Sequence, residues 1–468
     1  MLVGGCITAV QNGIGMVRML NFKPYPITLK RNLLIASIIF PDNVSSITPF
    51  KTNNEHEKSM HVEKPSTEVL ESFVAEYKLN SSLKLTPEQR NELMNVLYQN
   101  RDVFAREISE IKTYKNFELK LKSRSWDIKS YTRQYKLPEY QAEEAHRQIE
   151  EMKKQGLVTE SEDCTYNSPV FMVAKKNSQL RMVCDLRKIN HLLKPFVIQL
   201  PKIDQILNDI AAQNPQVLTT IDMYKGYHSI RLSPKTNQLT AFCSPKTGQS
   251  YVWQVLPVGL SASSGAFVYV INKLFQDKEK FPYLFYYIDD CLISSSSFSE
   301  HLKHLNAVFA TLRTNSLTVN PSKTCAGFDE IEFLGHTVSS KGVRISDSKT
   351  QAIRKITAPS TRRSLQRLLG LLQYFRKHVS NYSARTYNMR QLLKQDSKFQ
   401  WTEQCENELQ DLKNALINAP ILAPFRADRK VYIYTDGSLY GLGACCLQMN
   451  NLNQPEICSY MSLSLIHI

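Results

Sequence analysis

The sequence predicts an α+β fold made of several domains. Its 468 residues exceed the roughly 100–200 residues of a typical single domain, and 42% of them are hydrophobic, enough to bury a core. Short runs rich in β-branched and aromatic residues are mixed with segments of helical period, without the regular strand–helix–strand repeat of a doubly wound parallel sheet. This irregular mixture favours an α+β architecture.

The charge balance indicates a polyanionic partner. Lys and Arg total 58 against 43 Asp and Glu, a net charge of +15, which is typical of nucleic-acid binding but also of a generic basic surface. The 10 cysteines show no C-x-x-C and no Cys/His spacing of a metal site, so we expect a reduced intracellular protein. The apolar run at 33–40 is too short to cross a bilayer, and no membrane partner is expected.

The first half of the chain begins with a β-rich segment over 1–50 and a linker over 51–83, which is polar over 51–68. A helix is expected after Thr86, which is a capping residue followed by Pro87, and another over 139–156. Apolar runs predict strands, and helical spacing predicts two further helices between or after them. The strands are expected at 169–176, 180–187, 217–227, 251–257 and 283–295, and the helices at 265–275 and 301–313.

The last third reads as helical and then as the start of another domain. Residues 361–379 carry an apolar stripe with a basic opposite face, and Thr402 is a candidate cap for a second helix. A strand begins at Lys430, but too few residues follow for a complete domain.

Three carboxylates carry the clearest chemical signal. Asp289 and Asp290 stand between two apolar runs, which predicts a hairpin, although an isolated Asp-Asp pair is more often a plain polar turn without chemistry. Asp222 ends another apolar strand. If the strands are neighbours, three like charges meet at one end of a sheet, which is costly unless cations neutralise them. Two divalent ions on oxygen ligands could then activate a hydroxyl and stabilise a leaving phosphate.

The ordered motifs resemble one family. The segments NSPVFMVAKK, RMVCDLRKIN, TTIDMYKGYHSIRL, LPVGLSASSGAF, YYIDD and FLGHTVSSKGVRIS stand in this order, followed by LLGLLQYFRKHVSNYS and YIYTDGSLYGLGACCLQ. Together they are similar to the reverse transcriptase of gypsy-type LTR retrotransposons, over about residues 84 to 460. The N-terminal stretch resembles the β-rich segment between protease and polymerase in the same polyproteins.

The resemblance implies a right-hand polymerase with fingers, palm and thumb, a helical connection and the start of an RNase H-like α/β domain. The expected segments are a β-rich segment over 1–50, a linker over 51–83, fingers and palm over 84–296, a thumb over 297–350, a helical connection over 351–425 and a truncated RNase H-like domain over 426–468.

The resemblance also implies the activity, an RNA-directed DNA polymerase that adds dNTPs to a primer 3′-hydroxyl. RNA template, DNA primer and RNA–DNA hybrid are the implied partners, a homodimer is left open, and retrotransposon particles imply a cytoplasmic location, with the nucleus as an alternative. Two other functions stay open: a catalytically inactive nucleic-acid-binding relic, and an RNA-dependent RNA polymerase, which should carry a small or polar residue in place of Tyr227.

By the same resemblance, Asp222, Asp289 and Asp290 are the catalytic carboxylates. Asp222 and Asp289 would hold two Mg²⁺ ions, or Mn²⁺, with the backbone carbonyl of Met223, and Asp290 would be auxiliary. The implied dNTP-binding and primer-grip residues are Lys175 and Arg181 at the triphosphate, Tyr227 as the gate against a 2′-hydroxyl, Val258 beside the nucleotide, and Phe333, Leu334, Gly335 and His336 at the primer end.

The sequence departs from the family pattern at two places. Val258 stands inside LP-x-G, and residues 262–265 replace the usual N-A-P, which puts nucleotide affinity and fidelity in doubt. Asp436 matches the first RNase H carboxylate, but Glu456 is the only acid after it, so we expect no RNase H activity. The final LSLIHI reads like a translated sequencing adaptor, with a natural apolar strand as the alternative.

Overall fold

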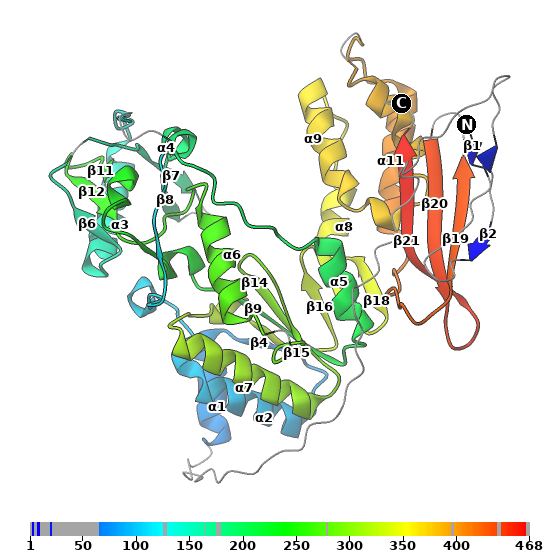
Figure 1. The fold of residues 1–468 in the computed structure, drawn as a ribbon, viewed down its shortest axis with the longest axis horizontal. Helices are drawn as coiled ribbons and strands as arrows, with labels where there is room; N and C mark the ends of the chain where they lie inside the picture. The colour runs from blue at the N-terminus through cyan, green and yellow to red at the C-terminus, as the bar shows by residue number, and fades with distance from the viewer. Residues whose placement is uncertain are drawn as a thin grey trace. The chain divides into compact units, whose positions relative to one another are not determined.

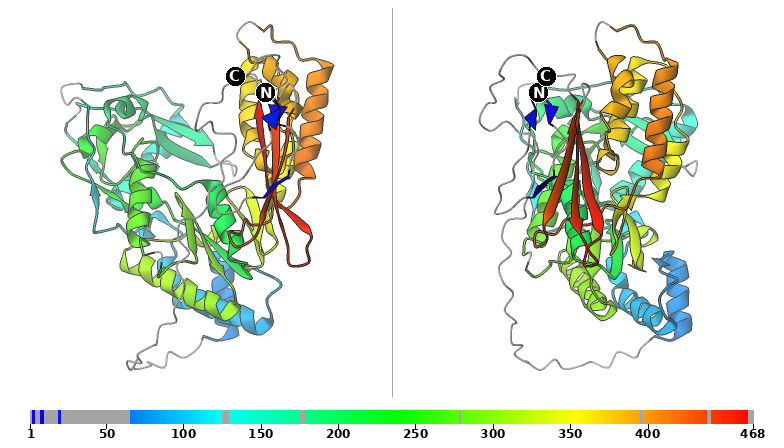
Figure 2. Two further views of the ribbon diagram at one scale, coloured as in Figure 1. Left: turned by 45° about the vertical axis from the view of Figure 1, so that its right-hand side comes forward. Right: turned by 90° about the vertical axis from the view of Figure 1, so that its right-hand side faces the viewer.

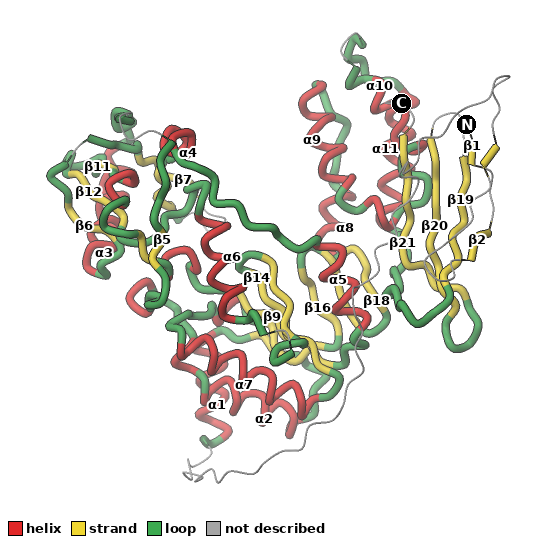
Figure 3. The backbone as a smooth tube through the Cα atoms, viewed as in Figure 1, coloured by secondary structure: helices red, strands yellow, loops and turns green. Residues whose placement is uncertain are grey.

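The computed structural model describes residues 65–124, 129–163, 165–174, 179–277, 279–394, 397–437 and 441–464, and the pairing of three short N-terminal strands, β1 (Leu2–Val3), β2 (Ile7–Ala9) and β3 (Met19–Leu20). The chain forms two compact units. We call residues 64–203 and 216–331 the carboxylate unit, and residues 1–63, 204–215 and 332–468 the C-terminal unit. Figure 1 labels their elements, Figure 2 gives two further views, and Figure 3 separates helices from strands.

A five-stranded sheet is the centre of the carboxylate unit. Its order is β13 (Leu284–Tyr287), β14 (Asp290–Ser295), β9 (Val217–Asp222), β15 (Cys325–Phe328) and β4 (Asn80–Ser81). Every pairing is antiparallel except that of β15 with β4. Helix α7 (Phe298–Thr314) packs against β14 and β9, and α2 (Pro87–Gln99) packs against α7 (Figure 1).

The carboxylate unit also contains shorter sheets and further helices. The hairpin β7–β8 pairs Val170 through Ala174 with Leu180 through Cys184. The other elements are α1 (Thr67–Tyr77), β5 (Glu118–Leu119), α3 (Glu139–Lys154), β6 (Val158–Glu160), α4 (Arg187–Leu192), β10 (Arg231–Leu232), β11 (Phe242–Cys243), β12 (Ser250–Trp253) and α6 (Ser263–Leu274).

The C-terminal unit combines two antiparallel sheets with helices. One sheet contains β16 (Glu330–Phe333), β17 (His336–Ser339) and β18 (Gly342–Ile345), and the other has the order β2, β19 (Val431–Gly437), β20 (Gly441–Met449) and β21 (Pro455–Ser464). Its helices are α5 (Ile203–Ala212), α8 (Asp347–Arg354), α9 (Arg362–Gln373), α10 (Tyr387–Gln391) and α11 (Glu403–Ile417). Leucines from α9 and α11 form much of its helical core.

The α+β fold is confirmed, and so are most of the predicted elements. Thr86 caps α2 in a reciprocal capping box with Gln89, and Pro87 is the first helical residue. Thr402 caps α11 by accepting from the backbone N–H of Cys405. In the described part of the chain, no helix combines the length and the apolar character needed to span a membrane.

The linker prediction is wrong for its second half. Residues 67–77 form α1, whose cap Ser66 accepts from the N–H of Val69 and whose Leu70 and Phe73 are buried in the core. Apolar residues at helical spacing outweigh the polar composition of this stretch. Residues 51–64, and most of the predicted β-rich segment, lie outside the described residues. The division into six segments stays a prediction.

A buried polar network lies beneath the central sheet. His301 of α7 is fully buried. Its Nε2 is 2.6 Å from the hydroxyl of Thr219 on β9, and its Nδ1 is 2.8 Å from that of Ser295 on β14. Ser295 also contacts His304, at 2.8 Å. Burial lowers the pKa of His301 to about 3, so the folded chain holds this ring neutral.

Acidification should therefore destabilise the chain. An unfolded His takes up a proton near pH 6.5 whereas folded His301 does not, so stability is lost as the pH falls from about 6.5 toward 3, by about 1.4 kcal/mol per pH unit. We expect the urea midpoint to fall from pH 7 to pH 5, and to fall less in His301→Gln. His191→Gln, at an exposed site, is the control and should keep the wild-type pH dependence; equal dependence in both variants would contradict this account.

Candidate active site

The structure brings the three predicted carboxylates to one end of the central sheet. β9 and β14 pair in a register that places Asp222 directly opposite Asp290. Asp289 stands next to Asp290 in the two-residue turn that joins β13 to β14, where Tyr287 pairs with Asp290. The antiparallel pairing thus brings Asp222 next to Asp289 and Asp290, although they are far apart in the sequence.

The turn that carries Asp289 is strained. Ile288 has a φ of +59°, a left-handed conformation that costs a β-branched residue about 1–2 kcal/mol. The backbone N–H of Met223 donates to the carbonyl of Asp289 at 3.4 Å, and that of Asn320 donates to the carbonyl of Asp222 at 2.8 Å. The first bond ties the turn to the residue after β9, the second ties the end of β9 to Asn320, and the Met223 side chain is buried.

The carboxylates act on one another electrostatically. Burial raises the pKa of Asp222, and the charge of Asp289 adds to this, while Lys323 opposes it. The pKa of Asp290 is also raised, first by desolvation and then by Asp289 and Asp222. The neighbouring negative charge thus disfavours ionisation of Asp222 and Asp290, as expected for like charges at a shared site.

Lys323 is the residue that the sequence interpretation missed. Its ammonium lies 3.1 and 3.0 Å from the two carboxylate oxygens of Asp222. It ends the short helix η5 (Pro321–Lys323), which leads into β15, the neighbour of β9. No sequence pattern marks this lysine, because its approach to Asp222 depends on the pairing of two strands far apart in the chain.

The donor set fits a hard divalent cation. Asp222, Asp289 and Asp290 supply carboxylate oxygens, which such ions prefer, and the Lys323 ammonium already takes a cation's place at Asp222. Within the described residues, no three His, Cys, Asp or Glu side chains are arranged to share one ion. Because the Lys323 ammonium lies 3.0 Å from Asp222, a metal at this carboxylate would have to displace it.

Tyr227 lies five residues after Asp222, on the short helix η3 (Gly226–Ser229). Its ring meets that of Phe267 edge to face at 5.7 Å, and its hydroxyl is 3.3 Å from that of Ser264 on α6. Gly226 allows this approach, because a Cβ there would lie 2.7 Å from the Phe267 ring. Ser264 belongs to residues 262–265, which depart from the family pattern. One of these residues therefore contacts Tyr227, the predicted gate against a 2′-hydroxyl.

The other predicted nucleotide residues are placed in part. Arg181 lies exposed on β8. The pKa of His228, the residue after Tyr227, is lowered to about 4, first by burial, then by the charge of Lys225, and to a smaller extent by the charge of Arg181. Val258 is 39% exposed. Lys175 lies outside the described residues.

The predicted primer-grip residues form the turn between β16 and β17 in the C-terminal unit. Leu334 and Gly335 have φ values of +50° and +74°. The carbonyl of Leu334 accepts from the Tyr374 hydroxyl at 2.9 Å and lies 3.1 Å from Nδ1 of His336. Phe333 and His336 are buried. Tyr374, which follows α9, was not singled out from the sequence.

Asp436 and Glu456 are not brought together. Asp436 on β19 pairs with Gly443, whereas Glu456 on β21 pairs with Gln448, which is level with Val431. Five residues of strand separate the two levels, roughly 17 Å at the usual rise per residue. Glu456 instead pairs with Arg429 at 3.5 Å.

Two family models match the chain. The model described as reverse transcriptase (RNA-dependent DNA polymerase) matches residues 173–338, which include Asp222, Asp289 and Asp290. The model described as an RNase H-like domain found in reverse transcriptase matches residues 401–467. The chain therefore carries a reverse transcriptase domain followed by an RNase H-like region.

Curated relatives and solved structures agree with these matches. The Tf2-3 and Tf2-7 transposon polyproteins of Schizosaccharomyces pombe are each 29% identical over 394 residues, covering 81% of this chain; the chain spans only 29% of their length. A foamy viral protease–reverse transcriptase in complex with double-stranded DNA superposes with a TM-score of 0.74 at 22% identity, covering 88% of this chain and 83% of that one. The same protein with an RNA/DNA hybrid gives 0.72 at 21% identity, covering 88% and 54%. The right-hand fold class is thereby confirmed.

Replacing Lys323 should strengthen divalent-cation binding at the carboxylates. The ion must displace an ammonium whose partly exposed ion pair contributes about 1 kcal/mol, so Lys323→Gln should bind Mn²⁺ roughly fivefold more tightly, as measured by electron paramagnetic resonance titration. Lys84→Gln is the matched control, because Lys84 pairs with Asp329 instead. Equal Mn²⁺ affinity in both variants would show that Lys323 does not compete with the ion.

Proposed function

We propose that this chain, which carries a reverse transcriptase domain, is an RNA-directed DNA polymerase that extends a primer on an RNA template. The observation that carries the proposal is the convergence of Asp222, Asp289 and Asp290 at one end of a sheet within residues that match the reverse transcriptase model. Like charges held this close favour the binding of cations, and carboxylate oxygens are ligands that divalent metal ions prefer. Lys323 balances part of this charge at Asp222.

In this proposal the carboxylates position two divalent ions, Mg²⁺ or Mn²⁺. When bound, such ions activate an attacking hydroxyl and stabilise the charge on a leaving phosphate. Asp222 and Asp289 would hold them with the backbone carbonyl of Met223, and Asp290 would support the site. The raised pKa values of Asp222 and Asp290 mean that both carboxylates bind a cation more readily as the pH rises.

The nucleotide would lie between the carboxylates and the β7–β8 hairpin. Arg181, with Lys175, would neutralise the triphosphate of a dNTP, and Tyr227 would stand under the sugar, beside Val258. Phe333, Leu334, Gly335 and His336 would hold the primer end. The resemblance to foamy viral proteins in complex with double-stranded DNA and with an RNA/DNA hybrid supports nucleic acid as the partner.

We further propose that the parent protein is the polyprotein of a gypsy-type LTR retrotransposon that acts in cytoplasmic particles. The similarity to the Tf2 polyproteins supports the retrotransposon origin. Sedimentation of the tagged chain with element RNA in a cytoplasmic fraction would test the location.

Asp222→Asn and Asp289→Asn should each lower primer extension by several orders of magnitude while leaving template–primer affinity within a few fold. The carboxylates position metals for chemistry, whereas duplex affinity comes mainly from Lys and Arg contacts to phosphates. Single-nucleotide extension on an RNA template measures the extension rate, and fluorescence anisotropy measures the template–primer affinity. Asp329→Asn, in a surface ion pair, is the control; near-normal rates in the first two variants would refute the polymerase assignment. Asp290→Asn should have a smaller effect.

Tyr227→Ala should raise ribonucleotide incorporation relative to deoxyribonucleotide. Loss of the ring opens space for a 2′-hydroxyl, so discrimination falls by steric relief. Tyr227→Phe keeps the ring against Phe267 and loses only the hydroxyl near Ser264, and it should discriminate as the wild type does. The kcat/KM ratio for rNTP over dNTP is the measurement. If Tyr227→Ala leaves this ratio unchanged, another side chain is the gate.

The chain should not cleave RNA in a hybrid. Two-metal hydrolysis requires several carboxylates around the ions, and the register keeps Glu456 far from Asp436. A labelled RNA–DNA hybrid incubated with the chain and Mn²⁺ should stay intact. Metal-dependent cleavage that disappears in Asp436→Asn would contradict this expectation.

A further inference from the structure

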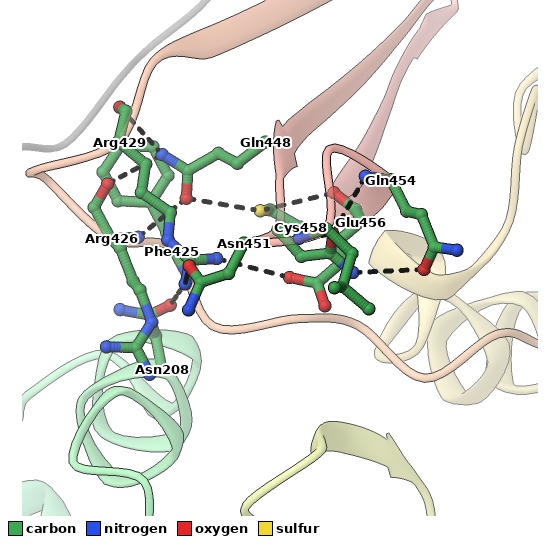
Figure 4. Close-up of polar contacts among 11 residues, drawn as sticks. Asn208, Phe425, Arg426, Arg429, Gln448, Asn451, Gln454, Glu456 and Cys458 are labelled. Atoms are coloured by element: carbon green, nitrogen blue, oxygen red, sulfur yellow. Dashed lines mark hydrogen bonds and ion pairs between the residues drawn. The ribbon is translucent and has the colours of Figure 1, made fainter.

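A cavity of about 270 Å³ opens in the C-terminal unit, outside the residues assigned above. Three segments line it: the turn between β17 and β18 with Ser340 and Lys341, the connecting segment 423–429, and the loop between β20 and β21 with Asn450 to Leu452 and then Glu456. Figure 4 shows the connecting segment and the loop facing each other across the polar contacts that join them.

The backbone around the cavity is fixed by a buried amide. The Gln448 side chain, 1% exposed, accepts from the N–H of Arg426 at 2.8 Å and donates to the carbonyls of Arg426 at 2.7 Å and Arg429 at 3.1 Å. The N–H of Phe425 donates to Asn208 at 2.7 Å. Leu422 exchanges two 2.8 Å backbone hydrogen bonds with Val343. The segment is therefore held in place before any ligand arrives.

Positively charged side chains outnumber negatively charged ones in the lining of the cavity. Arg429 contacts Glu456 at 3.5 Å and the Asn451 side-chain oxygen at 3.1 Å. The side chains of Lys341 and Arg426 have no hydrogen-bond or ion-pair partner within the described part of the chain. Three cations thus face one carboxylate, and two of the three are free to bind a ligand.

The lining selects the class of ligand. Guanidinium, ammonium and amide donors outnumber acceptors, which favours an anion with several oxygens, and the planar fork of Arg426 suits phosphate oxygens. The volume is smaller than that of a typical drug-sized ligand site, which favours a compact group. Only Ala423, Pro424 and Leu452 are apolar, so a lipid tail or aromatic ligand finds little surface.

We propose that this cavity binds a phosphate group, with Lys341 and Arg426 as its main contacts and Arg429 behind them. The phosphate belongs to the backbone of a nucleic-acid strand or is free phosphate. The net charge of +15 and the function proposed above favour the strand, and to that extent the inference rests on that function. The cavity would then hold a strand at a point that belongs to the C-terminal unit alone.

The test compares two double variants of the full chain. Lys341→Gln/Arg426→Gln removes the two free cations, and Lys355→Gln/Lys398→Gln removes two exposed lysines elsewhere in the same unit, so the change in net charge is identical. One arm measures the affinity of a fluorescent RNA–DNA hybrid by anisotropy over a range of salt concentrations. The other measures inorganic phosphate binding by ³¹P nuclear magnetic resonance. Primer extension by the wild type runs in parallel.

The cavity variant should bind the hybrid several-fold more weakly than the control, and its slope of log affinity against log salt should fall by about 1–2, since each phosphate contact contributes about 0.9. Loss of inorganic phosphate binding with unchanged hybrid affinity would support a free phosphate as the ligand. Equal behaviour of both variants in both arms would overturn the inference while wild-type extension leaves the polymerase proposal intact. Conversely, a wild type that neither extends primers nor binds the hybrid would refute the proposed function, and the phosphate arm alone would then decide the cavity.

Discussion

The clustering of three carboxylates at one end of β9 and β14 is the constraint on which the rest of the site depends. Six residue pairs join these strands and place Asp222 opposite Asp290. Leu292 and Ile293 are buried on opposite faces of β14, and a slip of one residue would send each side chain to the other face, so packing on both faces of the sheet fixes the register. The carboxylates therefore cannot move apart to relieve their repulsion. A cation must compensate them, and among the described residues Lys323 supplies such a charge at Asp222.

The turn and the hydrogen bonds around the three carboxylates hold them in a fixed position. Ile288 adopts a left-handed conformation because the two-residue turn must bring Asp289 beside Asp290, and strain of this kind persists only where neighbouring contacts over-determine the backbone. Strand pairing on one side and the bond from Met223 on the other supply those contacts. The neutral His301 beneath the sheet joins Thr219 of β9 to Ser295 of β14. Both strands are thus held from below as well as from within the sheet.

Features set by local sequence could be predicted, and those set by long-range pairing could not. Thr86 with Pro87 defines the start of α2, and the apolar runs around Asp289 define a hairpin. The meeting of Asp222 with that hairpin was a conditional expectation, because sequence does not reveal which strands are neighbours. Lys323 and Tyr374 were missed since each contacts its partner only through tertiary packing. Helix α1 was missed because the linker predicted from the polar residues before it was extended over Leu70, Phe73 and Val74, which stand at helical spacing.

The sheet of β19, β20 and β21 shows how register separates residues that appear related in sequence. Asp436 and Glu456 are the two acids of this region that could be assigned to one site, yet the pairing of β20 with both neighbours puts them at different levels of the sheet. At its own level, Glu456 lies next to Arg429 and neutralises one cation of the basic cavity. Gln448, which pairs with Glu456 in the sheet, also fixes the backbone of Arg426 and Arg429. The end of the sheet that carries Glu456 is therefore the end that holds these two arginines. Glu456 therefore lines the basic cavity and pairs with Arg429, away from the level of Asp436.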